Sequence, residues 1–181
     1  MKRIIPIAIG VLAVFAGAFA QDQAAIDRAL AAAPANAKKD ATVIKWKSDF
    51  TYDTLRKGTN KMVCYELSGM TIHPAFMSEC TSLANLDRQA QNLKIESIKD
   101  AKARAAAFEA AEKDGTRVKP EFGSVWYHVM GADQEHARTH MTIAVPMATS
   151  KTMGLPETGA TGGVWIMNAG TTTAHLMTPG E

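Results

Sequence analysis

The sequence predicts a single α+β domain, in which a mainly antiparallel sheet of about six strands packs against one long helix. Three observations lead to this prediction. Several short segments alternate apolar and polar residues, as half-buried strands do. A central segment repeats its apolar residues at three- and four-residue steps, as an amphipathic helix does. Most connections between the strand segments are short, and short connections favour antiparallel pairing.

The first twenty residues have the pattern of an export signal. A basic start at Lys2 and Arg3 precedes an apolar run that ends at Phe15, and Ala-Phe-Ala at 18–20 offers a peptidase site. The apolar run is short for a bilayer span, which needs about 20 residues. We therefore expect a signal peptide over 1–20, no stable membrane anchor after cleavage, and a soluble mature chain that is periplasmic or secreted.

The charge balance argues against two classes of partner. Of the 20 basic residues, Lys2 and Arg3 lie in the expected signal, which leaves 18 basic residues against 18 acidic ones. Nucleic acids and anionic membranes are bound through basic surfaces. We therefore expect a ligand or protein partner of another kind and no nucleic acid.

The segment 21–40 predicts a short helix and a tether. Residues 21–33 are rich in strong helix formers, and Pro34 ends the run. We expect this segment to lie outside the core of a domain that spans 41–181.

Strand patterns begin at Ala41. Period-two alternation on both sides of residues 47–49 predicts two strands joined by a tight turn. A third strand is expected over 61–67, after turn residues at 58–60. Glycine and proline then punctuate 68–74, which is therefore expected to be a loop.

The segment 78–114 is expected to be helical, because its apolar residues form one stripe that includes Leu86 and Leu93. Its length suggests a break near 91–94, and Gly115 is suited to end it. The stripe predicts packing against the chain's own sheet, with self-association through this helix as an alternative. Strand patterns return in four later segments, 124–130, 139–145, 163–167 and 173–177.

Cys64 and Cys80 are the only cysteines in the chain. In an exported protein a disulfide is the default for such a pair. It would close a loop of about 16 residues and stabilise the fold by roughly 3 kcal/mol. The alternatives are a redox pair or two thiolate ligands, which the spacing does not favour because it is far from C-x-x-C.

Four of the five histidines, His128, His136, His140 and His175, lie in the last third of the chain. The i, i+4 spacing of His136 and His140 is that of a zinc-binding helix, but the segment containing His140 alternates as a strand. If His128 lies opposite His140 on neighbouring strands, both point to one face. His175 or His136 could then complete a site for zinc or copper. The alternative is a pair of solvated histidines that bind nothing.

Other chemical motifs are absent from the sequence. Ser68 lacks the first glycine of a G-x-S-x-G elbow, and the glycine-rich 159–163 lacks the Lys-Ser/Thr of a phosphate-binding loop. His73 and Glu79 form an acid–base combination of a kind that arises by chance. The ten methionines are scattered singly, which predicts core packing rather than copper(I) ligation. We therefore expect no cofactor and no catalytic activity, with zinc or copper as the alternative.

A set of short motifs resembles a family of small exported bacterial proteins for which no activity is known. The likeness spans roughly 41–178, although Ala174 stands where the family has a proline. It implies an exported single domain with a structural core at Trp165 and His175, and no catalytic role for any residue. The motifs, in chain order, are Leu55–Asn60 (LRKGTN), Cys64, Cys80, 126–131 (WYHVMG), Trp165 and 175–177 (HLM).

These observations together predict a soluble exported protein with a non-catalytic binding or accessory role. The alternative function is that of an exported metal-binding protein or metal-dependent hydrolase that uses the histidine cluster.

Overall fold

The computed structural model describes residues 22–70 and 72–178. The export signal expected over 1–20 lies outside the described residues. Within the described ranges, no helix has both the length and the apolar character needed to cross a membrane.

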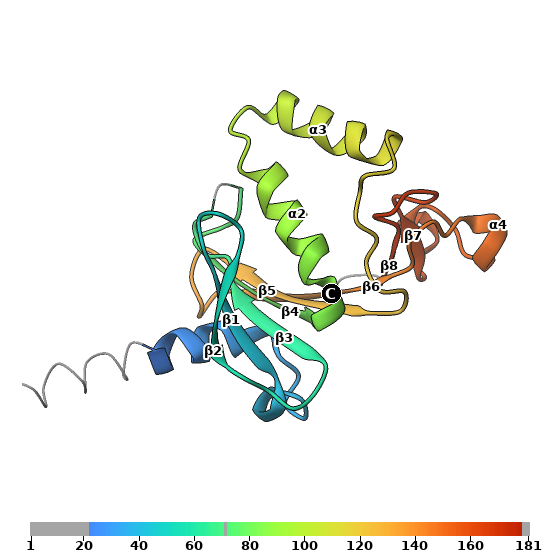
Figure 1. The fold of residues 1–181 in the computed structure, drawn as a ribbon. Helices are drawn as coiled ribbons and strands as arrows, with labels where there is room; N and C mark the ends of the chain where they lie inside the picture. Colours follow the sequence, from blue (N-terminus) through green and yellow to red (C-terminus); the bar gives the residue numbers. More distant parts are fainter. Residues whose placement is uncertain (1–21, 71, 179–181) are drawn as a thin grey trace, which may run out of the picture.

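The centre of the molecule is one open eight-stranded sheet with strand order β2-β1-β3-β4-β5-β6-β8-β7 (Figure 1). Among the strands of the described residues, only the β1–β3 pair is parallel, and all other neighbours are antiparallel. The α+β class and the mainly antiparallel sheet are therefore confirmed, with more strands than expected. The strands are β1 (Thr42–Trp46), β2 (Tyr52–Arg56), β3 (Met62–Glu66), β4 (Phe76–Ser82), β5 (Val125–Gly131), β6 (Arg138–Ala144), β7 (Trp165–Met167) and β8 (His175–Met177).

Strand β4 corrects the prediction of a helix from residue 78 onward. It lies between β3 and β5 and is buried on both faces along nearly all of its length. A strand covered on both faces has no apolar–polar alternation, so its residues carried no period-two signal. The chain turns after β4 through η3 (Leu83–Asn85), whose first turn is capped by the Ser82 side chain.

Two helices follow where one long helix was expected. They are α2 (Leu86–Glu96) and α3 (Ala101–Lys113), so the break falls after Glu96 rather than at 91–94. The Asp100 carboxylate accepts a hydrogen bond from the Ala103 N–H at 2.7 Å and begins α3, which explains the position of the break. Figure 1 shows α2 rising from the sheet and α3 crossing its far end, away from the sheet. The short α4 (Ser150–Met153) lies between β6 and β7.

The disulfide between Cys64 and Cys80 is confirmed, and the two residues lie directly opposite each other on β3 and β4. Both are fully buried in a cluster on one face of the sheet that also contains Val43. The other face carries a second cluster in which Tyr65 and Leu93 are buried. The α2 stripe therefore packs on the chain's own sheet, as predicted.

The N-terminal segment corrects a second expectation. Its helix, over 22–29, and η1 (Leu30–Ala32) do not lie outside the core, because Ile26, Ala29 and Leu30 are buried in the disulfide cluster. These residues recur at i, i+3 and i+4, so they form one face of the helix. The segment covers the face of the sheet that lies opposite α2, and that face would otherwise expose the disulfide (Figure 1).

The expected tether is also fixed to the sheet, through the motif that precedes β3. Asn60 donates a side-chain hydrogen bond to the Ala37 carbonyl at 3.0 Å, and its backbone N–H donates to the Asp40 carbonyl. A Cβ atom on Gly58 would lie 2.3 Å from that Asp40 oxygen, so only glycine fits here.

The C-terminal core differs slightly from the one implied by the resemblance. Trp165 and His175 are half-buried, while their neighbours Ile166 and Ala174 are buried in a third apolar cluster. The half-buried positions leave the His175 side chain available to a cavity on the α2 face.

Burial of the N-terminal segment generates a prediction about stability. Leu30→Ala should lower the free energy of unfolding by about 2–4 kcal/mol, because it leaves a cavity against the disulfide cluster. Urea denaturation followed by circular dichroism measures the change. Gln23→Ala, at an exposed position of the same N-terminal segment, serves as the control and should shift the midpoint little. Equal stability of both variants and the wild type would place this segment outside the core.

Candidate functional site

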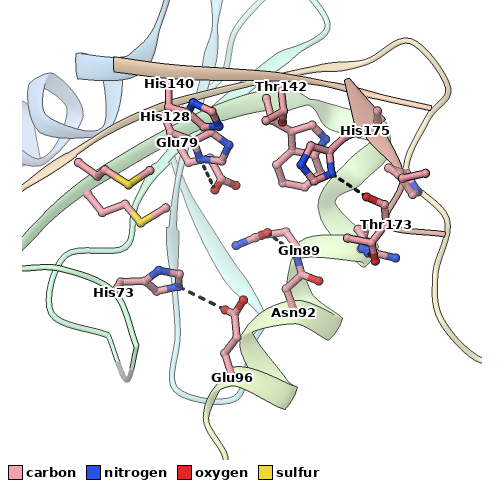
Figure 2. Close-up of a pocket in the computed structure, with 17 residues that line it drawn as sticks. His73, Glu79, Gln89, Asn92, Glu96, His128, His140, Thr142, Thr173 and His175 are labelled. Carbon is pink, nitrogen blue, oxygen red and sulfur yellow. Dashed lines mark hydrogen bonds and ion pairs between the residues drawn. The ribbon is translucent and has the colours of Figure 1, made fainter. Parts of the chain in front are cut away.

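A cavity of about 350 Å³ lies between α2 and the sheet (Figure 2). Its floor is built from alternate residues of four neighbouring strands, which all point to the same face. Its opposite wall is the sheet-facing side of α2. The floor residues are Met77 and Glu79 of β4, Trp126, His128 and Met130 of β5, His140, Thr142 and Ala144 of β6, and His175 of β8.

The wall on α2 is polar where a packed helix is ordinarily apolar. Arg88, Gln89, Asn92 and Glu96 all line the cavity, and Arg88 and Gln89 are buried. Their spacing of i, i+1, i+4 and i+8 places them on one side of the helix. Departures from the apolar pattern at positions that face a core are expected at functional sites.

The sheet register forms a transverse row of polar side chains across the floor. Tyr65, Glu79, His128 and His140 lie directly opposite one another on β3, β4, β5 and β6. Because all four point to the α2 face, neighbouring side chains in the row are in contact distance.

Glu79 is the centre of that row and is only 4% exposed. The fully buried Tyr65 hydroxyl donates a hydrogen bond to Glu79 Oε1. Burial, together with the nearby Glu79 charge, raises the pKa of Tyr65 well above its ordinary value, so the phenol remains a hydrogen-bond donor at neutral pH. On its other side, Glu79 Oε2 lies 3.1 Å from His128 Nδ1.

The Glu79–His128 contact has the separation of an ion pair but not the alignment of a hydrogen bond. The His128 Nδ1 atom is buried and makes no aligned hydrogen bond in the described part of the chain. The attraction therefore acts mainly through charge and is strongest when His128 is protonated. With Nδ1 facing Glu79, the other ring nitrogen, Nε2, is left for the cavity.

The His128 and His140 rings lie with their centroids 5.9 Å apart and their planes at 28°. Burial, and then the charges of His128 and His175, lower the pKa of His140 below its ordinary value. The neutral form of the His140 imidazole is therefore favoured. His175 Nδ1 lies 2.7 Å from the Thr173 carbonyl oxygen, which can only accept, so Nδ1 carries a proton and the other ring nitrogen, Nε2, is not used in this contact.

The structure brings together three of the four histidines that the sequence nominated. His128 lies opposite His140, as predicted, and His175 lines the same cavity from β8, opposite Ala144. His136 does not join them: its side chain is 73% exposed, and its Nδ1 lies 2.8 Å from Asp133 Oδ1 in the β5–β6 loop. Across 22–70 and 72–178, no three His, Cys, Asp or Glu side chains are arranged to hold a metal ion.

Several site residues were missed by sequence reasoning. The His73–Glu79 combination is not formed, because His73 Nε2 lies 3.2 Å from Glu96 Oε2 and joins the 68–74 loop to α2 (Figure 2). Glu79 instead contacts Tyr65 and His128. The sequence places polar residues at 88, 89, 92 and 96 on one side of a helix. It does not reveal that this side faces the sheet.

Arg88 fixes one side of the cavity. Its guanidinium donates hydrogen bonds to the Val118 carbonyl, to Thr172 Oγ1 at 2.9 Å and to Thr173 Oγ1 at 2.7 Å. The Glu112 carboxylate accepts from the same two threonines. Burial and the nearby Arg117 charge lower the pKa of Arg88 to about 10, and it remains charged at neutral pH. The network joins α2, α3 and the segment before β8.

The network around Arg88 generates a second prediction. Arg88→Met should lower the free energy of unfolding by about 3 kcal/mol, because the Val118 carbonyl and both threonines lose a charged donor. Thermal and urea unfolding measure this loss. Arg138→Met, at an exposed arginine on β6, is the matched control and should change stability by less than about 0.5 kcal/mol. A similar small effect from both substitutions would contradict a structural role for Arg88.

Comparisons of the chain with protein-family models, with curated proteins and with solved structures find no match. The resemblance to a family of small exported proteins therefore stays a prediction. The geometry and chemistry of the cavity are the basis for assigning a function.

Proposed function

We propose that the protein is an exported, non-catalytic binding protein that takes a small organic ligand into the cavity between α2 and the sheet. One observation carries the proposal: both walls present polar side chains at positions where two packed layers ordinarily bury apolar ones. Polar groups cost free energy when they are buried away from water without full hydrogen bonding. A binding function accounts for their retention.

The lining has the mixed composition of a small-molecule site. A volume of about 350 Å³ lies within the usual range for such sites, which are apolar with a few polar groups that fix orientation. Trp126, Met77 and Met130 supply apolar surface on the floor. Gln89 and Asn92 supply amides on the opposite wall.

The hydrogen-bonding capacity of the cavity favours a ligand that donates rather than an acidic one. The Arg88 guanidinium is already engaged with Val118, Thr172 and Thr173, so it offers little to an anion. Glu79 and Glu96 would repel a carboxylate or phosphate. In its neutral form the His175 ring offers Nε2 as an acceptor, which suits a ligand hydroxyl or amine.

Export is supported by two independent features. The N-terminal sequence has the pattern of a signal peptide. The Cys64–Cys80 disulfide is of the kind that persists in oxidising compartments such as the periplasm.

Ligand capture tests this function. The wild-type protein is incubated with the small-molecule fraction of a periplasmic extract, recovered, and analysed by mass spectrometry for retained compounds. Thr142→Phe places a ring in the cavity from its floor and should abolish retention. The expected result is a compound enriched on the wild type and absent from the Thr142→Phe variant.

The matched control is Thr54→Phe, which makes the same change at an exposed position on β2. It should retain the compound as the wild type does. Retention of nothing by the wild type, or equal retention by Thr142→Phe, would show that the cavity is not a binding site. Circular dichroism spectra of both variants establish that they fold.

A further inference from the structure

We propose that the floor of the cavity binds one copper ion through the imidazoles of His128 and His140 and the thioether of Met130. This proposal does not depend on an organic ligand, because it concerns the sheet side of the cavity alone. It also replaces the four-histidine site that the sequence suggested with a smaller set of residues that the fold places together.

The register places the three proposed ligands around one point of β5. His140 lies directly across from His128 on the neighbouring strand. Met130 follows His128 by two residues on the same strand, so it points to the same face about 7 Å along the backbone. All three line the same cavity. A thioether side chain is flexible enough to approach a metal held by the two rings.

The methionines are not isolated on this face, although they are scattered in the sequence. Met77 lies directly opposite Met130 on β4 and lines the cavity beside it. Two thioethers and two imidazoles therefore occupy adjacent positions of three neighbouring strands. Sequence spacing could not reveal this group because Met77 and Met130 come from strands that are far apart in the chain.

The donor set selects the metal. Thioethers are soft ligands that favour Cu(I), and imidazole suits both copper and zinc. Calcium and magnesium require oxygen ligands, which this group does not supply. Since the described residues gather no three His, Cys, Asp or Glu ligands, an ordinary zinc site is not expected there.

Glu79 and Tyr65 have the arrangement of outer partners at a metal site. A histidine that binds a metal through one nitrogen commonly directs the other at a carboxylate, which orients the ring. Here the Nδ1 atom of His128 faces the Glu79 carboxylate at 3.1 Å, and the Tyr65 hydroxyl holds that carboxylate from the other side. The Nε2 atom of His128 is then the nitrogen left for copper. Glu79 is a positioning residue in this scheme.

The two other histidines that line the cavity, His73 and His175, are not part of the proposed set. His175 pairs with Ala144, four residues along β6 from His140, so Thr142 lies between them on the floor. His175 therefore remains available to an organic ligand that binds in the same cavity.

Competition for Cu(I) tests the proposal. The purified protein, freed of metal, is titrated against the Cu(I) complex of a coloured chelator under reducing, anaerobic conditions that leave the buried disulfide intact. The wild type should remove one copper per chain from the chelator. His128→Gln and His140→Gln should each lower the affinity at least tenfold, and Glu79→Gln should lower it by about 10- to 100-fold.

Met130→Leu separates a thioether ligand from simple packing, because leucine conserves the volume. It should weaken Cu(I) binding about tenfold while leaving Zn²⁺ binding unchanged. Met167→Leu and His136→Gln change an exposed methionine and an exposed histidine and should have no effect. The comparison of Met130→Leu with Met167→Leu remains informative even if a histidine variant folds poorly.

Two outcomes would overturn the proposal. One is a wild-type affinity for Cu(I) no higher than that of a His128→Gln, His140→Gln double variant. The other is unchanged Cu(I) binding in Met130→Leu together with zinc binding as tight as copper binding, which would exclude the thioether as a ligand. Because this titration uses the metal alone, failure here leaves the result of the ligand-capture experiment unaffected.

Discussion

The buried Glu79 carboxylate is the group around which the polar side of the molecule is arranged. A carboxylate that is 4% exposed must be compensated, because removing an ionised group from water without partners is costly. The Tyr65 hydroxyl and the His128 ring supply that compensation from the two neighbouring strands. This arrangement requires β3, β4 and β5 to keep one register, since a one-residue slip would turn these side chains to opposite faces.

Both faces of the sheet bury apolar residues, and the face opposite the cavity does so around the disulfide. There the disulfide, Val43 and the N-terminal helix form an apolar cluster. This face buries apolar surface against the N-terminal helix. The other face holds α2 beside the cavity through Leu93 and the Arg88 network.

The parts of the fold that could be predicted from the sequence are those in which apolar residues recur at a regular spacing. The pairing of His128 with His140 was predictable because both strands alternate and a short loop joins them. Strand β4 could not be predicted from the sequence. Burial on both faces removes its apolar–polar alternation, and its apolar residues run on into the apolar stripe of the helical segment. The N-terminal helix was recognised, but its burial was not, since alanine-rich faces carry a weak apolar signal.

The site was less predictable than the fold, for a reason that follows from sheet geometry. A transverse row draws one residue from each strand, so Tyr65, Glu79 and His128 are distant in sequence and adjacent in space. No spacing rule links them until β4 is known to lie between β3 and β5. Once that order is fixed, the polar side of α2 faces the row, because Gln89 and Glu96 lie beside Leu93, which packs on the same face of the sheet. The cavity is thus a consequence of where one unrecognised strand lies.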